Sequence, residues 1–126
     1  MIDTIEENKI TEKIIGLCFK VHSSIGPGFT ERIYQNSLVV LLKQENITYE
    51  TEKPYALTFA ENRVGNFRLD LVIENKVILE LKSLAGNIPK IFESQMISYL
   101  KASGLRVGLL INFGNKSCQI KRVSHY

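Results

Sequence analysis

The chain has 126 residues and a formal net charge of +3, with 44% hydrophobic and 23% charged residues. This length can bury a core without disulfides or a structural metal, and the composition is that of an ordinary soluble globular protein. No apolar run approaches the ~18 residues of a membrane span, and the polar, acidic start MIDTIEENKITEK is unlike a signal peptide. We therefore expect a cytoplasmic protein that has no membrane partner and folds as one domain over residues 1–126. Cys18 and Cys118 fit no metal-ligand spacing and are expected to be reduced thiols.

Two helices are predicted at the start of the chain. Apolar residues recur at helical spacing over residues 7–23, and Thr4 with Glu7 has the spacing of a capping box ahead of this helix. Gly26-Pro27-Gly28 ends the first helix. A second helix is predicted over residues 30–44, with Thr30 as its N-cap.

A run of strands follows the helices, and we expect them over residues 47–52, 55–60, 64–73 and 77–82. Pro54 separates the first two strands, and Glu61-Asn62-Arg63 is expected to form the turn before the third. The last two of these strands form a hairpin.

The remaining elements complete an α/β pattern. A third helix is predicted over residues 88–103, with Gly104 just beyond its end and the apolar stripe Ile88, Ile91, Phe92, Met96, Tyr99 and Leu100. Residues 106–113, RVGLLINF, are typical of a strand covered on both faces, and residues 118–123 form a last strand. The order ααβββαββ, which leaves open whether residues 47–52 and 55–60 count as one strand or two, predicts a central mixed sheet flanked by helices.

The hairpin carries charges among its apolar residues. Because side chains alternate across a strand, we expect one wholly apolar face, made of Phe67, Leu69, Leu71, Ile73, Val77, Leu79 and Leu81. The other face would carry Arg68, Asp70, Val72, Ile78, Glu80 and Lys82.

The length of the hairpin loop decides whether the two acids meet. A two-residue turn at Glu74-Asn75 would pair Asp70 with Leu79 and send Glu80 to the opposite face. A three-residue connection that includes Lys76, with Asn75 or Lys76 in the left-handed region, pairs Asp70 with Glu80. We favour the three-residue connection, because the other register would push Glu80 into the core.

Paired in this way, Asp70 and Glu80 would have Cβ atoms ~4.5–5.5 Å apart. Two carboxylates at that distance repel each other unless a cation lies between them, and Mg²⁺ prefers one or two carboxylates completed by water. Lys82 shares their face, where its ammonium can hold a phosphate oxygen or orient a water. The alternative is a polar outer sheet face on which these charges pair with one another.

The spacing of these residues resembles a known motif. Asp70, followed after nine residues by Glu80-x-Lys82 across a hairpin, resembles the motif of the PD-(D/E)XK nuclease superfamily. Gln95-x-x-x-Tyr99 on the next helix is similar to the QxxxY motif of RecB-type members.

A second signature extends this resemblance. Residues 28–34, GFTERIY, are similar to the GxxExxY signature of a family of small bacterial proteins, and RLDLVIENKVILELKSL, ESQMISYLKASGLRVGLLINFG and IKRV follow in that family's order. The resemblance covers roughly residues 10–123. Leu69 stands at the superfamily's nominal proline, and Phe92 stands where many relatives carry a histidine, so Phe92 receives no role.

The resemblance implies a restriction-endonuclease-like fold and metal-dependent hydrolysis of phosphodiester bonds, in DNA rather than RNA. Asp70 and Glu80 would bind Mg²⁺ or Mn²⁺, joined by the Leu81 backbone carbonyl and by Glu31. Metal-bound water would be the nucleophile, and Lys82 would orient it and stabilise the transition state. The implied catalytic residues are Asp70, Glu80, Lys82, Gln95 and Tyr99.

Several of these residues also have a structural interpretation. Glu31 lies in the first turn of a helix, where a carboxylate suits the dipole. Gln95 has the alternative of a satisfied core amide, and Tyr99 that of an amphipathic core residue. Arg68 is expected to contact phosphate or to pair with a nearby acid, whereas His22 is expected to be structural.

Two other functions stay open. The first is a nuclease-fold accessory or regulatory protein that binds nucleic acid with weak or no catalysis, and the second is a protein-interaction domain that binds no divalent metal. Because the chain is only mildly basic, one monomer should bind a phosphate backbone weakly. We therefore expect a homodimer, and the small size suggests a further protein partner.

Overall fold

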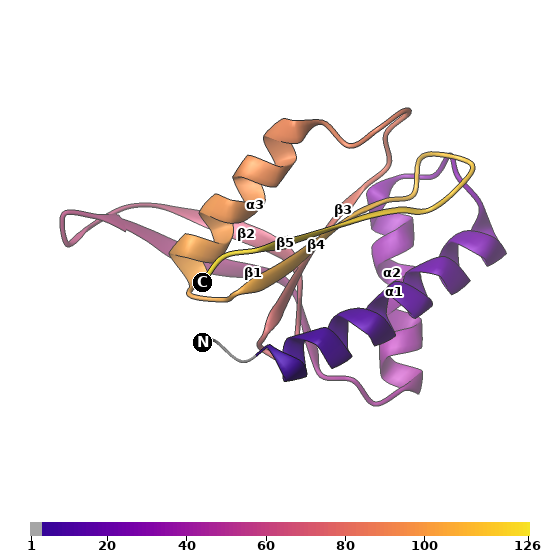
Figure 1. Ribbon diagram of the computed structural model, residues 1–126, viewed down its shortest axis with the longest axis horizontal. Helices are drawn as coiled ribbons and strands as arrows, with labels where there is room; N and C mark the ends of the chain where they lie inside the picture. Colours follow the sequence, from indigo (N-terminus) through magenta and orange to yellow (C-terminus); the bar gives the residue numbers. More distant parts are fainter. Residues whose placement is uncertain (1–3) are drawn as a thin grey trace.

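The computed structural model describes residues 4–126, in which helices cover both faces of a five-stranded mixed sheet (Figure 1). The elements, in chain order, are α1 (Ile5–Ile25), α2 (Glu31–Gln44), β1 (Tyr49–Phe59), β2 (Asn62–Ile73), β3 (Val77–Lys82), α3 (Lys90–Ser103), β4 (Val107–Asn112) and β5 (Gln119–Ser124). This order and the flanked mixed sheet confirm the predicted α/β fold class.

The strands lie in the order β1-β2-β3-β4-β5. Neighbours are antiparallel except β3 and β4, which are parallel because α3 crosses over between them. Strand β4 is buried along its whole length, as expected for a central strand covered on both faces. No helix within residues 4–126 is long and apolar enough to cross a membrane.

The core consists of two clusters separated by the sheet. Helices α1 and α2 pack against one face, through residues such as Leu17, Leu38 and Leu79. Helix α3 packs against the other, through Met96 and Leu100. Figure 1 shows the same division, with α1 and α2 on one side of the strands and α3 on the other.

The two predicted N-cap residues make no side-chain capping hydrogen bond, although Thr30 does occupy the N-cap position of α2. Thr4 occupies the N-cap position of α1 but its side chain makes no capping hydrogen bond, so the predicted capping box does not form. Glu7 is buried instead and accepts hydrogen bonds from Arg106, with Nε at 2.9 Å and Nη2 at 2.8 Å from Oε2. At the other end of the chain, Gly104 ends α3 in the left-handed region with φ of 79°, as predicted.

Three boundaries also differ. Strand β1 runs without interruption through Pro54, which an edge strand tolerates. The tip of the β1–β2 hairpin is Ala60-Glu61, with φ of 50° and 65°, rather than residues 61–63. Helix α3 begins at Lys90 because Pro89 takes the N-cap position, and Ile91, predicted for the buried stripe, is 69% exposed.

The prediction of one continuous apolar face on the hairpin is wrong for the part of β2 that precedes Asp70. Leu71 packs with the α1–α2 cluster, whereas Leu69 and Phe67 pack with the α3 cluster. The alternation is reset at Asp70, whose backbone N–H donates to a side chain instead of to a ladder carbonyl. Glu52, which lies opposite Asp70 in the β1–β2 register, has φ of 50° at the same level. Such an irregularity increases the local twist of the paired strands.

Candidate active site

The β2–β3 register brings the two predicted acids together. Ile73 pairs with Val77 and Leu71 with Leu79, so the three-residue connection is confirmed and Asp70 comes next opposite Glu80. The left-handed residues of the connection are Glu74 and Asn75, with φ of 54° and 55°. Lys76, one of the two residues suggested for that conformation, does not have it; its N–H donates to the Ile73 carbonyl at 2.9 Å.

Each of the two carboxylates bonds to the backbone of the other strand. Glu80 Oε2 accepts a hydrogen bond from the Asp70 N–H at 2.7 Å, and Asp70 Oδ2 accepts one from the Leu81 N–H at 2.8 Å. The side chains thus replace backbone ladder bonds where the regular β2–β3 pairing ends. We call these two carboxylates the Asp70–Glu80 pair.

The Asp70–Glu80 pair is buried without a neutralising partner. Glu80 is 6% exposed and Asp70 is half-buried. Burial, followed by the charge of Asp70, raises the pKa of Glu80 to about 8, and burial also raises the pKa of Asp70. No ion pair within residues 4–126 involves either carboxylate. Such a pair favours a bound proton or a bound cation.

Lys82 lies at the end of β3, beside the pair. Its Nζ is 4.0 Å from the centroid of the Phe92 ring on α3, a distance typical of a cation–π contact. Its positive charge lowers the pKa of both Asp70 and Glu80, which opposes the larger effect of burial. Phe92, which received no role from the sequence, is therefore the side chain that holds the ammonium.

A buried asparagine fixes the loop that follows Lys82. Asn112 is fully buried; its Oδ1 accepts hydrogen bonds from the Leu84 N–H at 2.9 Å and the Gly114 N–H at 3.0 Å. Its Nδ2 donates to the Leu84 carbonyl at 3.0 Å and the Gly86 carbonyl at 3.3 Å. A Cβ on Gly114 would lie 2.3 Å from the Leu84 nitrogen, so this close approach requires glycine.

Helix α3 presents the remaining predicted residues on one face. Tyr99 is half-buried, its ring stacks on Phe67 with centroids 5.1 Å apart, and the charges of Glu80 and Asp70 add to burial in raising its pKa. Gln95 is half-buried one turn before Tyr99. The hydrogen bonds found within residues 4–126 do not include its amide, so it lacks the partner that a satisfied core amide would have.

Glu31 lies at the start of α2 and interacts only weakly with the pair. It is the exposed first residue of α2, and its charge makes only the smallest of the contributions that raise the pKa of Asp70. The described part of the chain contains no group of three acidic, histidine or cysteine side chains close enough to hold one ion. Glu31 instead lines a cleft of about 480 Å³ with residues that include Thr30 and Ser83. Ser83 Oγ donates to the Phe29 carbonyl at 2.6 Å, which ties the start of α2 to the end of β3.

An acid that the sequence analysis did not identify lies beside the pair. Thr51 pairs with Leu71 and Lys53 with Leu69, which places Glu52 opposite Asp70. Glu52 is half-buried, and its charge contributes to raising the pKa of both Asp70 and Glu80. Its neighbour Pro54 suggested a break between strands, so the sequence gave no reason to place this residue opposite the site.

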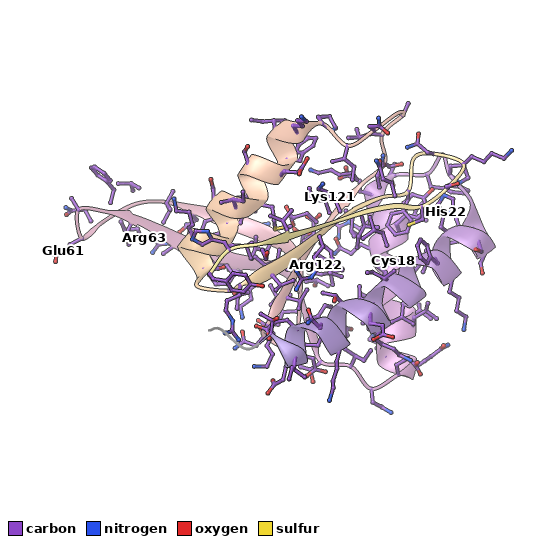
Figure 2. All side chains as sticks on the ribbon, in the orientation of Figure 1. Cys18, His22, Glu61, Arg63, Lys121 and Arg122 are labelled. Atoms are coloured by element: carbon purple, nitrogen blue, oxygen red, sulfur yellow. The ribbon has the colours of Figure 1, made fainter. Side chains whose placement is uncertain are left out.

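The last two candidates lie at the margins of the site. Arg68 is exposed on β2, opposite Pro54, and has no ion-pair partner within residues 4–126. His22 is buried on α1 (Figure 2), with Nε2 2.8 Å from the Asn115 carbonyl oxygen and its ring stacked on Phe113. These contacts agree with the structural interpretation of His22, which anchors the loop after β4.

Comparisons with known proteins agree with this geometry. The chain is similar to the solved structure described as "Crystal structure of SSO0001", with 21% sequence identity, a TM-score of 0.59, and coverage of 75% of this chain and 50% of that chain. The chain thus spans half the length of that protein, and the likeness concerns the fold alone. No functionally curated protein matches. The family model of the PD-(D/E)XK nuclease superfamily matches residues 8–123. The chain therefore belongs to the PD-(D/E)XK nuclease superfamily.

Proposed function

We propose that this protein is a metal-dependent nuclease that hydrolyses phosphodiester bonds, with DNA preferred to RNA as the substrate. The observation that carries the proposal is the Asp70–Glu80 pair, in which a half-buried and a buried carboxylate meet at the end of the β2–β3 pairing without an ion-pair partner within residues 4–126. Carboxylates in a structural ion pair would contact a lysine or arginine side chain. Carboxylates in a metal site must be free of such a contact so that they can bind the metal ion.

The donor set fits a divalent cation such as Mg²⁺ or Mn²⁺. Asp70 and Glu80 would hold it, and the Leu81 carbonyl would join them, since the Leu81 N–H already points to the Asp70 side chain. Mg²⁺ is commonly bound by one or two carboxylates with water and substrate phosphate completing the shell, so a site with two carboxylates is sufficient. Glu31, which lines the neighbouring cleft, would be a further ligand of the cation. When bound, the cation would neutralise charge that develops on the phosphate and acidify a nearby water.

The remaining side chains have roles that follow from their positions. Lys82, held by Phe92, would donate to a phosphoryl oxygen and stabilise charge in the transition state. The free amide of Gln95 and the hydroxyl of Tyr99 line the same face of α3, where they would position the substrate or a water. Arg68 would contact the phosphate backbone. The roles of Gln95 and Tyr99 correspond to the QxxxY motif, and Glu31 belongs to the GxxExxY motif. Both motif assignments are part of the proposal.

The protein would act in the cytoplasm as a single nuclease domain and as a homodimer, since two subunits would present more basic surface to one nucleic acid. One observation favours the alternative of a nuclease-fold accessory protein with weak catalysis. Glu31 does not form a three-acid group with Asp70 and Glu80 in the described part of the chain. That alternative retains nucleic-acid binding but predicts slow cleavage.

The test is cleavage of single- and double-stranded DNA and RNA with Mg²⁺ or Mn²⁺, with Glu80→Ala as the control. Calorimetric titration of the metal in the absence of substrate separates the candidates. We expect binding of Mn²⁺ that Glu80→Ala abolishes, and cleavage lost in the same variant. Metal binding without cleavage of any substrate would favour the accessory function, and the absence of both would contradict the proposal.

A further inference from the structure

Strands β1 and β2 extend beyond the site as a free arm, formed by residues 53–69 (Figure 1). Every residue from 56 to 66 is exposed, and Figure 2 shows Glu61 and Arg63 at the far end of the arm. The base of the arm is fixed to α3 by stacked rings, because Phe67 lies 5.6 Å from Tyr55 and 5.1 Å from Tyr99 between centroids. The arm therefore has a defined position relative to the Asp70–Glu80 pair.

An apolar stripe runs along the arm from the site to the tip. Tyr55 and Leu57 share one face of β1, and Phe59 follows beyond a register shift that lies between Leu57 and Thr58. Leu57 is 44% exposed and Phe59 is 74% exposed, and Val64, which lies at the same register shift on β2, is 59% exposed. Exposed apolar groups gathered in this way mark an interaction surface.

The arm is also positively charged. Arg63 and Arg68 are exposed and form no ion pair within residues 4–126; Arg63 donates only to Asn66. The arm has one acidic residue, Glu61, at its tip. The third basic residue, Lys53, is engaged by Glu50 at 2.7 Å. Two arginines without acidic partners suit a phosphate backbone.

We propose that this arm lies in a groove of duplex DNA whose backbone crosses the Asp70–Glu80 pair, an inference that rests on the proposed nuclease function. The major groove of B-form DNA admits a two-stranded β-ribbon, and thymine methyl groups offer apolar contacts there. The major groove of A-form RNA is too deep and narrow for side chains to read. The arm therefore selects double-stranded DNA as the substrate class.

The length of the arm sets its reach. From Asp70 to Asn62 there are eight residues of β2, which at ~3.3 Å per residue extend roughly 26 Å. Base pairs are spaced ~3.4 Å along the duplex axis, so the tip lies about 8 base pairs from the scissile phosphate. A duplex shorter than this cannot contact the site and the tip together.

A protein partner fits this surface less well. A stable protein–protein interface buries roughly 800 Å² on each partner. Leu57, Phe59 and Val64 are already partly buried, and their remaining exposed surface falls well short of that area. The arginines of the arm would also require an acidic patch on a protein partner.

The test combines the triple variant Leu57→Ser, Phe59→Ser, Val64→Thr with a matched control. All three positions are exposed, so the fold should tolerate the changes. The control is Phe19→Ser with Val40→Ser, which removes apolar groups that are 47% and 53% exposed from α1 and α2, far from the arm. Fluorescence anisotropy without divalent cations measures binding to a long DNA duplex of about 20 base pairs, a short DNA duplex of about 6 base pairs, single-stranded DNA and duplex RNA. Hydrolysis of bis(4-nitrophenyl) phosphate with Mn²⁺ reports the metal site alone.

We expect the triple variant to weaken binding to the long duplex by roughly tenfold, as for the loss of one large buried apolar contact. It should leave binding to the short duplex and hydrolysis of the small ester unchanged, and the control variant should behave as the wild type. Unchanged binding to the long duplex, or an equal loss on single strands or RNA, would overturn the inference. The inference would also be overturned if light scattering showed that the wild type is a dimer and the triple variant a monomer, because the stripe would then join two copies of the chain. If the wild type hydrolyses the small ester but binds no duplex, the inference fails while the nuclease proposal stands; if it does neither, both fail.

Discussion

The Asp70 N–H donates a hydrogen bond to the Glu80 carboxylate at 2.7 Å, so the second acid of the site is held by the backbone of the first. The Asp70 carboxylate in turn accepts from the residue that follows Glu80. Neither side chain can move away without leaving a buried N–H unpaired, which costs about 1–3 kcal/mol. The fold thus holds two repelling carboxylates together before any cation is present.

This arrangement predicts that the metal-free protein is less stable at high pH. Burial and the charge of Asp70 raise the folded-state pKa of Glu80 from 4.5 to about 8, so the folded state binds more protons than the unfolded state between these values. The resulting stability is fully present below pH 4.5 and is lost as the pH rises through 8. Between pH 5.5 and pH 9 the loss should amount to about 3–4 kcal/mol.

Urea unfolding with a chelator at pH 5.5 and pH 9 measures this dependence. Glu80→Gln should remove most of the slope, and Glu61→Gln at the exposed arm tip should keep it. An equal slope in Glu80→Gln and the wild type would show that the proton is held elsewhere.

A divalent cation should replace that proton. Binding at pH 7 is expected to release protons, so the calorimetric enthalpy of Mn²⁺ binding should vary with the ionisation enthalpy of the buffer. At ten times the dissociation constant the folded state gains about 1.4 kcal/mol, which raises the melting temperature by about 4 °C. Asp70→Asn should abolish both effects. A melting temperature that millimolar Mg²⁺ and Mn²⁺ leave unmoved would contradict the metal site.

The pairing of Asp70 with Glu80 could be predicted from the sequence because the apolar residues on both sides allow only one register. The same reasoning failed one residue further, where Leu69 turns to the opposite face of the sheet from Leu71. A side chain that replaces a ladder bond breaks the alternation, and the residue pattern does not show such a replacement.

Contacts between segments that are distant in the sequence could not be predicted either, because the residue pattern does not show them. Asn112 ends a strand that was expected to be covered on both faces, but the residue pattern does not show that it holds Leu84, 28 residues earlier. Glu52 lies beside the pair because β1 continues through Pro54. Both positions depend on which strands pair, a property of the whole fold rather than of any local run.

The position of Glu52 makes a prediction about the charges of the site. Its carboxylate contributes to raising the pKa of Asp70 and of Glu80, so Glu52→Gln should lower the pKa of both. Carboxyl-carbon NMR titration of the metal-free protein measures this directly. Glu50→Gln is the matched control, since Glu50 is two residues away on the same strand and is paired with Lys53. Equal shifts in the two variants would mean that Glu52 does not act on the pair.

Asn112 should be among the most sensitive positions outside the Asp70–Glu80 pair. Asn112→Leu keeps the volume but leaves the Leu84 and Gly114 N–H groups and the Leu84 and Gly86 carbonyls without their partner. Water can reach part of this loop, so the expected loss is about 2–4 kcal/mol in the free energy of unfolding. Asn115→Ala, which removes a half-buried side chain from the same loop, should cost about 1 kcal/mol or less.

Hydrogen exchange separates loss of this clamp from general destabilisation. In Asn112→Leu the Leu84 and Gly114 amides should exchange far faster than in the wild type, while the amides of β3 lose protection only in proportion to the global change. Because Leu84 lies two residues beyond Lys82, the same variant should also weaken any activity that depends on the Lys82 ammonium. A Leu84 amide as protected as in the wild type would mean that the loop is held by its other contacts, chiefly the close approach of Gly114 and the bonds between Asn115 and Gly86.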